Sequence, residues 1–253
     1  MKITFLGTGT SQGVPVIACG CHVCTSTDPH DKRLRSSILI EGDGKTIVVD
    51  SGPDFRYQML RAGVKHLDGI VFTHEHKDHI AGMDDIRAFN FRQQSAIDIY
   101  ATERVQKSLE REFYYIFAEV KYPGIPEIKM HTIGLHPFCI GSIKFIPIEV
   151  MHYKLPVLGF RINDFTYITD AKTISEQEKE KIKGSRILVI NALQKQSHIS
   201  HFTYDEAIAF AQEMGAETTY FTHISHRLGR HAEISVELPP GIELAYDGLV
   251  LEI

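Results

Sequence analysis

The run from His74 to His79 constrains the fold of this chain more than any other feature. It holds four side chains of metal-binding type, His74, His76, Asp78 and His79, within six positions, directly after an apolar stretch that ends at Phe72. Residues two apart in an extended segment point the same way, so the first two imidazoles can converge on one cation. Asp78 and His79 lie where the chain should turn into a helix, which can aim them at a second cation. The run therefore predicts a two-metal site at the end of a strand.

Neutral imidazole and carboxylate groups suit zinc, manganese or iron. Two such cations about 3.5–4 Å apart can hold a bridging hydroxide and neutralise a phosphoryl or carbonyl oxygen. A solvated, histidine-rich loop is the competing interpretation, and it would be the ordinary one for any two of these residues. The full set behind an apolar strand favours metal binding, and the choice among the three metals stays open.

Short β-branched runs alternate with helical patterns along the chain, and no polar linker interrupts them. This order fits two sheets packed face to face with helices outside, in a single domain of residues 1–253. The stretch Tyr122–His136, which contains two prolines and two glycines, predicts a surface excursion or a lid. The expected strands are Lys2–Leu6, Ser37–Glu41, Thr46–Asp50, Gly69–Phe72, Ser142–Pro147, Leu158–Ile162, Thr166–Thr169, Arg186–Ile190 and Thr218–Thr222. The expected helices are Phe55–Ala62, Asp84–Arg92, Thr102–Phe113 and Thr203–Met214.

The charge balance excludes some partners. The chain has 27 basic and 32 acidic residues and a formal net charge of -5. A general attraction to nucleic acid or to anionic membranes is not supported, so phosphate recognition must be local. No run of about 18 apolar residues occurs, and the N-terminal run reaches Gly7 without the form of a signal peptide. The sequence predicts a cytoplasmic protein with no membrane partner.

Three of the four cysteines, Cys19, Cys21 and Cys24, lie within six positions. Without an export signal, such crowding favours metal ligation over a disulfide framework, and three thiols without a metal are the alternative. A tetrahedral structural zinc needs a fourth ligand from elsewhere. The candidates are His22, His30, Cys139 and His226.

The His-x-His-x-Asp-His pattern after a strand resembles the signature of the metallo-β-lactamase superfamily. The resemblance implies an αββα four-layer sandwich of two mixed β-sheets flanked by helices. It also calls for three later ligands, and His152, Asp170 and His223 each follow a predicted strand. It implies that His74, His76 and His152 bind one metal, that Asp78, His79 and His223 bind the other, and that Asp170 bridges them. Asp50 resembles the superfamily aspartate that orients a ligand histidine, and a turn aspartate is the alternative.

The cysteine cluster narrows the resemblance, together with the opening Phe5–Pro15 and the run Arg33–Ser37. The chain is similar over nearly its full length to the phosphoribosyl 1,2-cyclic phosphate phosphodiesterases of bacterial phosphonate degradation. That resemblance implies hydrolysis of a small phosphodiester, two active-site zinc or manganese ions, and a homodimer. It also implies a structural zinc on Cys19, Cys21, Cys24 and His226.

His201 precedes a predicted capped helix, in a histidine-apolar-threonine element that resembles one in the phosphodiesterases of the superfamily. There the histidine protonates the leaving oxygen, which an imidazole can do near neutral pH because its ordinary pKa is about 6.5. A histidine that only precedes a helix cap is the alternative. Asp78 is the second residue expected to take part in catalysis.

Two further segments bear on phosphate binding. Gly7–Gly13 lacks the Gly-Lys-Ser/Thr ending of a nucleotide loop, and its glycines instead predict close passage of the backbone beside the metal site. For Arg33, Arg35, Ser36 and Ser37 the sequence leaves two interpretations open: contact with a substrate phosphate, or a solvated loop.

Two other functions compete with phosphodiester hydrolysis. The opening loop and the histidine-apolar-threonine element also resemble ribonuclease Z, which processes tRNA ends, but no basic, glycine-rich arm is evident. The cysteine cluster resembles proteins of quinone-cofactor biosynthesis, which suggests a non-catalytic small-molecule carrier. A redox di-iron protein is disfavoured, because such relatives replace the second histidine of the motif, here His76, by glutamate.

Overall fold

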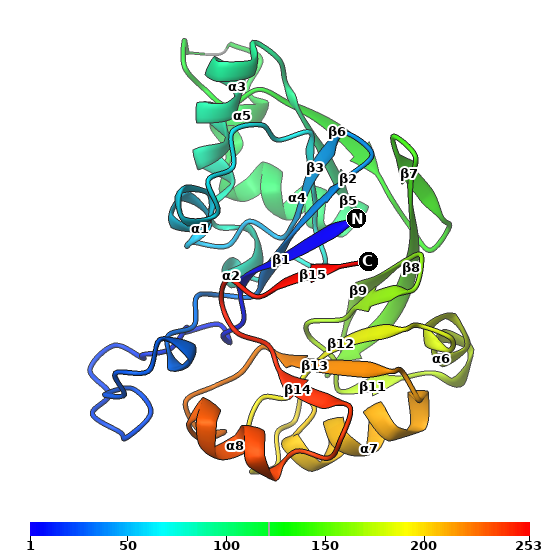
Figure 1. Ribbon diagram of the computed structural model, residues 1–253. Coiled ribbons are helices and arrows are strands. Elements are labelled where there is room, and N and C mark those ends of the chain that lie inside the picture. Colours follow the sequence, from blue (N-terminus) through cyan, green and yellow to red (C-terminus); the bar gives the residue numbers. More distant parts are fainter. Residues whose placement is uncertain (121) are drawn as a thin grey trace.

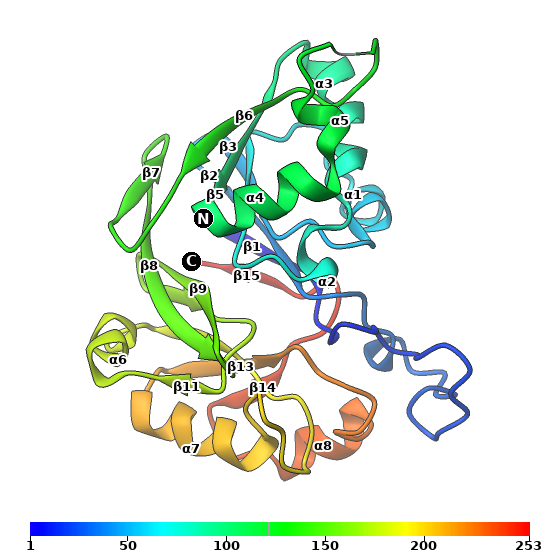
Figure 2. The same cartoon turned by 180° about the vertical axis from the view of Figure 1, so that it is seen from behind.

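Two β-sheets face each other across the middle of the molecule, and helices cover their outer surfaces (Figures 1 and 2). The computed structural model describes residues 1–120 and 122–253. Both sheets contain parallel and antiparallel neighbours, which confirms the predicted four-layer sandwich of mixed sheets. No helix in the described part of the chain is long and apolar enough to cross a membrane.

The first sheet has seven strands in the order β15-β1-β2-β3-β4-β5-β6. A tight turn at Asp43 and Gly44, both in the left-handed region, joins β2 to β3. The strands are β1 (Lys2–Gly7), β2 (Ser37–Gly42), β3 (Lys45–Val49), β4 (Gly69–Val71), β5 (Ile97–Ala101), β6 (Ile128–Thr132) and β15 (Val250–Glu252).

The second sheet has eight strands, in the order β11-β8-β9-β10-β12-β13-β14 with β7 paired to β8. Its long β8–β9 hairpin closes over the residues Tyr153 and Lys154. The strands are β7 (Phe138–Ile140), β8 (Ile143–His152), β9 (Leu155–Ile162), β10 (Phe165–Tyr167), β11 (Thr173–Ile174), β12 (Ile187–Asn191), β13 (Thr218–Thr222) and β14 (Ile242–Leu244).

Local signals explain where several helices begin and end. Thr203 and Glu206 form a capping box at the start of α7, and Gly63 and Gly215 end α1 and α7 in the left-handed conformation. The α-helices are α1 (Phe55–Ala62), α2 (Lys77–Ile80), α3 (Arg87–Gln93), α4 (Glu103–Glu112), α5 (Tyr114–Phe117), α6 (Glu176–Ile182), α7 (Tyr204–Met214) and α8 (His231–Glu237). Two 3-10 turns, η1 (Pro29–Asp31) and η2 (Met83–Ile86), complete the set.

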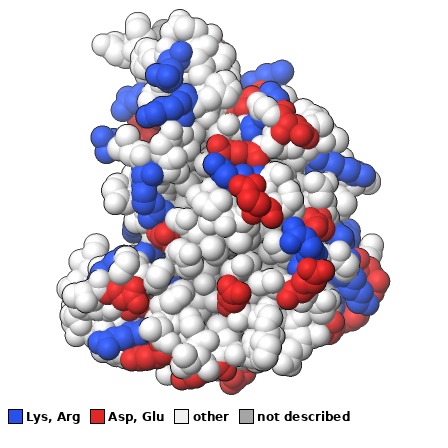
Figure 3. All heavy atoms as spheres, in the orientation of Figure 1, with Lys and Arg blue, Asp and Glu red and all other residues white. Residues whose placement is uncertain are grey.

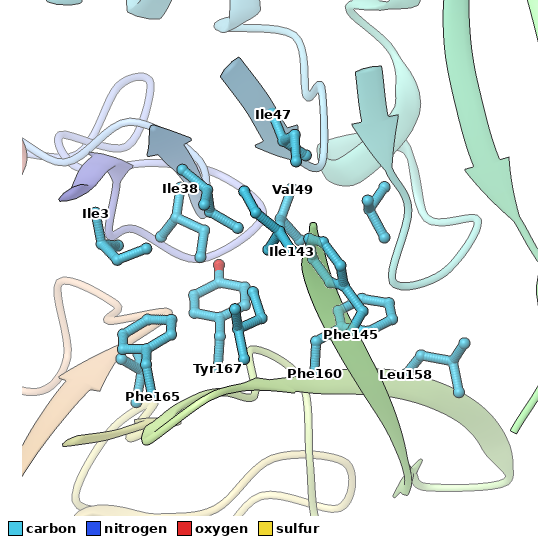
Figure 4. Close-up of a cluster of buried hydrophobic side chains, with 14 of the residues drawn as sticks. Ile3, Ile38, Ile47, Val49, Ile143, Phe145, Leu158, Phe160, Phe165 and Tyr167 are labelled. Atoms are coloured by element: carbon cyan, nitrogen blue, oxygen red, sulfur yellow. The ribbon is translucent and has the colours of Figure 1, made fainter. Parts of the chain in front are cut away.

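Alternation along the strands divides the core into layers. Ile38 and Ile40 of β2 point into the space between the two sheets, whereas Leu39 points outward to the helices. Phe145, Phe160 and other side chains of the second sheet meet them there (Figure 4). The strands are therefore held face to face, with their ends free to carry loops.

The structure corrects some sequence predictions. Tyr122–His136 is not only a surface excursion, because Ile128–Thr132 within it forms the edge strand β6. The predicted helix Asp84–Arg92 divides into η2 and α3. β8 extends to His152, so this histidine ends a strand five residues beyond the predicted one.

Candidate metal centre and active site

The loop after β4 carries the first four predicted ligands. His76 is the extended N-cap residue of α2, and Asp78 and His79 lie in the first turn of that helix. His74 Nε2 lies 3.0 Å from His76 Nδ1, and His79 Nε2 lies 3.1 Å from an oxygen of Asp78. The turn into α2 therefore brings all four side chains of the motif together, in two neighbouring pairs.

Asp170, in the loop after β10, lies at the centre of these side chains and is almost fully buried. Its Oδ1 is 3.3 Å from His223 Nδ1 and 3.5 Å from His79 Nε2. Its Oδ2 is 4.0 Å from His74 Nε2 and 3.9 Å from His201 Nδ1. One carboxylate thus faces four imidazoles that come from three separate loops.

Asp50 supports the motif from behind. Its carboxylate accepts hydrogen bonds from His79 Nδ1 at 2.7 Å and from the backbone and hydroxyl of Thr73, both at 2.8 Å. Asp50 has a φ of 64°, a left-handed conformation that is costly for a residue with a Cβ and that often occurs at functional sites. Gly52 is required nearby, because a Cβ there would lie 2.0 Å from the carbonyl oxygen of Asp78. The sequence anticipated Asp50 in this orienting position but missed Thr73.

The opening loop and β2 hold His223 in place. Ser36 Oγ lies 3.1 Å from His223 Nδ1, and Thr10 Oγ1 lies 3.2 Å from His223 Nε2. Glycines make this close passage possible, since a Cβ on Gly9 would lie 2.8 Å from the carbonyl oxygen of Arg33. The predicted close passage of this glycine loop is therefore present, whereas the role of Thr10 was not anticipated.

The structure does not support phosphate contact by Arg33, Arg35, Ser36 and Ser37. Arg33 is buried and donates to Thr8 Oγ1 at 2.7 Å and to the carbonyl oxygen of Ala245 at 2.6 Å. Arg35 pairs with Asp54 at 3.0 Å. The two serines are buried and bond within the protein, Ser36 to His223 and Gly9 and Ser37 to the carbonyl oxygen of Asp50. These side chains stiffen the site instead.

His152 and His201 lie on the side of the histidine cluster that the other residues leave open. His152 Nδ1 donates to the carbonyl oxygen of Ser200 at 2.8 Å, which leaves Nε2 directed away from that bond. The rings of His152 and His76 have centroids 5.2 Å apart, and those of His152 and His201 are 4.4 Å apart. His201 comes from the loop before α7. The contact between His152 and the carbonyl oxygen of Ser200 could not be predicted, because every residue has a backbone carbonyl and the sequence does not show which one accepts the bond.

Burial and neighbouring charges set the ionisation of the site. Burial acts to raise the pKa of Asp170, but the imidazoles of His223 and His79 outweigh it and hold the pKa well below its usual value. Burial lowers the pKa of His74 well below its usual value and also lowers the pKa of His223. Burial acts to lower the pKa of His79, but the carboxylates of Asp78 and Asp50 outweigh it and raise this pKa well above its usual value. Asp170 is therefore an ionised carboxylate beside neutral His74 and His223, a donor set that suits a divalent cation, and binding of the cation would displace the proton of His79.

Two orphaned buried atoms fit the same interpretation. Among the described residues, His79 Nε2 and His201 Nδ1 are buried and have no hydrogen-bond partner. Such atoms are costly unless a cation or substrate completes them. Three groups of side chains have ligand atoms within 4.8 Å of one another: His74, His79 and Asp170; Asp78, His79 and His223; and His152, Asp170 and His201. His76 belongs to none of these groups and lies beside His74.

A second cluster joins the N-terminal loop to the loop after β13. The thiols of Cys19, Cys21 and Cys24 lie 3.3, 3.4 and 3.5 Å from Nδ1 of His226. Ligands of a tetrahedral zinc with these donors are about 3.5 Å apart, so the arrangement fits such an ion. The backbone N–H of Cys24 and the imidazole of His226 help to lower the pKa of Cys21 to about 6, against the effect of burial.

The other candidates for the fourth ligand lie elsewhere. His22 and Cys139 are exposed, and His30 stacks on His231 with centroids 4.7 Å apart. In Figure 1 the cysteine loop is the blue segment that projects from the body of the molecule. Of the candidates, only His226 reaches the three thiols, and it lies three residues from His223.

Comparison with known proteins finds relatives of the same fold. A crystal structure of a diphosphatase from the PhnP family matches with a TM-score of 0.93 and 42% identity, covering 100% of this chain and 97% of that chain. Zinc-bound PqqB from Methylobacterium extorquens matches with a TM-score of 0.79 and 20% identity, covering 100% of both chains, which shows a shared fold.

A curated relative named octanoyltransferase, from Porphyromonas gingivalis W83, is 40% identical over 98% of this chain but only 51% of its own length. The chain thus spans about half the length of the curated relatives it matches.

A model of the family described as the β-lactamase superfamily domain matches residues 45–224, which include the His74–His79 motif, His152, Asp170, His201 and His223. Because this match covers most of the chain, and because the fold and a full-length neighbour agree with it, the chain belongs to the β-lactamase superfamily and has the metallo-β-lactamase fold.

Proposed function

We propose that this protein hydrolyses a small phosphodiester at a centre that holds two divalent cations, zinc or manganese. The observation that carries the proposal is the position of Asp170, whose two carboxylate oxygens face opposite halves of one histidine cluster. One half would hold a cation through Asp78, His79 and His223, and the other half through His74, His76 and His152. Two such cations supply charge stabilisation of a phosphoryl group and a water that ionises near neutral pH.

The chain's own residues arrange this chemistry. Asp50 fixes the ring of His79, and Ser200 fixes the ring of His152, so each imidazole presents its other nitrogen to the centre. Asp78 holds its negative charge because the neighbouring imidazole of His79 outweighs burial and keeps the pKa of this carboxyl far below its usual value. The ligand set is therefore oriented and charged before substrate arrives.

His201 is proposed to deliver a proton to the leaving oxygen, but not because its pKa is near neutrality. Burial lowers the pKa of His201 to about 2, so the premise drawn from its ordinary value is wrong. Its imidazole is neutral at pH 7 and gains a proton only when the negative charge of a substrate raises its pKa. The proposed role therefore belongs to the complex with substrate.

Changing His201 to alanine tests that role through the leaving group. We expect kcat to fall by about 10²-fold for a diester with an alkoxide leaving group, and by less than about tenfold for a p-nitrophenolate, which leaves without a proton. Steady-state rates with both substrates measure the difference. Equal losses on both would show that His201 only supports the structure.

A phosphorus substrate has support in the similarity to the PhnP-family diphosphatase, which shares 42% of its sequence with this chain. The name of this relative suggests a diphosphate linkage as a second candidate for the bond that is hydrolysed, besides the cyclic ribose phosphate that the sequence suggests. We therefore propose a small nucleotide-derived or sugar-derived phosphodiester, with the bond hydrolysed being either a phosphate ester or a phosphoanhydride.

The direct test is hydrolysis of bis(p-nitrophenyl) phosphate and of cyclic ribose phosphates by the metal-replete protein. We expect steady turnover that depends on added zinc or manganese. An Asp78→Ala variant gives the background rate, because it removes one proposed ligand from the His79 and His223 side. Turnover by the wild type no higher than this background on every substrate would reject the proposal.

Three other functions are less well supported. On the face shown in Figure 3, acidic side chains lie among the basic ones over most of the surface, and mostly basic side chains form only a strip along the upper left edge, which is a weak basis for tRNA binding. A gel assay with precursor tRNA tests ribonuclease Z activity.

A non-catalytic carrier would be favoured by a total of only one zinc per chain. Octanoyl transfer is not proposed, because the name belongs to a relative about twice as long.

A further inference from the structure

A cavity of about 400 Å³ lies between α1 and the segment formed by η2 and α3. None of the described residues that line it is a proposed metal ligand, and it has no residue in common with the cavity that opens at His76 and His152. Its volume is in the range of pockets that hold small organic ligands. The proposed hydrolysis therefore gives this cavity no role.

The floor of the cavity is apolar. It is formed by Phe55, Met59 and Phe89, which are 0%, 5% and 7% exposed. The rings of Phe55 and Phe89 meet edge to face, with centroids 6.4 Å apart. Leu60 also lines the cavity and is 61% exposed, so the apolar surface continues from the floor to the solvent. A ligand with an alkyl chain would gain binding free energy by covering this surface.

Basic side chains surround the apolar floor. Arg56, Lys65 and Arg92 line the cavity, and none of them forms a salt bridge with a residue that the structure describes. The cavity beside α6 and α7 differs, because its Lys179 pairs with Glu213 at 2.7 Å. In Figure 3, the strip of basic side chains along the upper left edge lies over the region that α1 and α3 occupy in Figure 1. The charge at the first cavity is therefore available to an anion.

The best position for that anion is beside Lys65 and Arg92. Nε of Arg92 donates to the carbonyl oxygen of Lys65 at 3.1 Å, which holds the guanidinium next to the lysine. Among the described residues, Asp85 is the one acid that lines the cavity. Burial raises the pKa of Asp85, and Arg56 acts against this rise, so the charge of Arg56 is partly offset by a neighbour. Lys65 and Arg92 have no such neighbour in the lining.

We propose that this cavity binds a small amphipathic anion, with its alkyl chain against the apolar floor and its carboxylate or phosphate head between Lys65 and Arg92. A ligand without the chain would leave the floor in water, and a ligand without the negative charge would leave both cations unpaired. Both parts are therefore needed. The inference goes beyond the proposed function, since it concerns a separate cavity and does not depend on hydrolysis.

The first test titrates the metal-replete protein with decanoate, decyl phosphate and decyltrimethylammonium, which share one alkyl chain and differ in the head group. Acetate supplies the carboxylate without the chain. By calorimetry, we expect at least one of the two decyl anions to bind about tenfold or more tightly than both decyltrimethylammonium and acetate, and the tighter anion identifies the head group. Equal binding of the anions and the cation, or no binding of either anion, would overturn the proposal.

Methionine methyl groups show where the anion binds. With methyl-labelled methionine, the NMR signal of Met59 should shift when the tighter anion is added, because Met59 lines the cavity. Met151 precedes the proposed ligand His152 and reports on the metal centre, so its signal should not move. Met59→Leu and Met151→Leu assign the two signals. A shift of Met151 without a shift of Met59 would place the anion at the metal centre and overturn the proposal.

Variants test the two parts of the site separately. Lys65→Gln combined with Arg92→Gln should weaken binding of the anion about tenfold. Ala88→Trp fills the cavity and should abolish binding with both cations still present. Lys107→Gln is the matched control, since it removes an exposed lysine of α4 outside the cavity, and it should leave the Kd unchanged. A double variant or an Ala88→Trp protein that binds the anion like the wild type would contradict the assigned site.

Discussion

Replacing Asp170 by alanine is expected to lower kcat for phosphodiester hydrolysis by roughly 10³-fold and to release cations from the centre. The carboxylate of Asp170 faces imidazoles from both proposed metal positions, at distances from 3.3 to 4.0 Å. Without it the imidazoles face one another, with less negative charge to offset two cations. Metal content per chain and steady-state rates with bis(p-nitrophenyl) phosphate are the measurements.

Two variants show whether the loss comes from the charge. Asp170→Asn keeps the volume of a side chain that is only 2% exposed, so it should fold like the wild type but lose most of the activity. Asp164→Ala removes an aspartate from the turn before β10, where it pairs with Arg186 and is 41% exposed, and it should leave rate and metal content unchanged. An Asp170→Asn protein with both cations and a rate within about tenfold of wild type would contradict the bridging role.

Much of the fold could be predicted because its signals are local. The helix Phe55–Ala62 was predicted to the residue, since Gly63 marks its end in the left-handed conformation. The missed elements lack such signals. Strand β15 has three residues, and it forms only because Val250–Glu252 meets β1 at the opposite end of the chain. No pattern within three residues can indicate a partner about 250 positions away.

In the candidate site, too, the features with a local sequence signal could be predicted and those set by distant contacts could not. The His74–His79 motif and the order of the later histidines could be recognised in the sequence, and the superfamily they indicated is confirmed. The role of Arg33 could not, because burial and its contacts with Ala245 and His231, some 200 positions later, decide it. The sequence of a basic run before a strand does not show whether its side chains bind phosphate or hold two loops of the protein together.

The second large effect is expected at the cysteine cluster. Changing Cys21 to serine should remove one zinc per chain and leave the projecting segment of residues 14–33 open to proteolysis. This segment has little core of its own, because its buried apolar side chains are limited to a small group formed by Val14, Val23 and Cys24. Zinc held by such a cluster contributes about 10–16 kcal/mol of binding free energy in zinc-finger peptides, which is much more than this small core can supply.

We expect the Cys21→Ser change to lower the activity of the proposed metal centre as well. His226 lies three residues after His223, and Thr10, in the loop that leads to the cysteines, lies 3.2 Å from the His223 ring. A loosened cysteine loop releases both supports of this proposed ligand, so we expect kcat to fall about 10- to 100-fold, as for other changes that disturb the residues behind a metal ligand. Limited proteolysis with mass spectrometry, zinc content and steady-state rates measure the three effects.

Cys139→Ser is the matched control. Cys139 is exposed on β7, apart from the cluster, so its loss should change neither zinc content nor cleavage nor rate. The pKa of Cys21 is lowered to about 6, whereas burial raises the pKa of Cys24 to about 11, so zinc must displace a proton from Cys24 when it binds. Because protons compete with zinc for the thiolates, we expect zinc to be released as the pH falls. A Cys21→Ser protein that keeps its zinc and resists protease would show that the thiols pack together without a metal. In that case His226 would steady the His223 loop only through its contacts with the thiols.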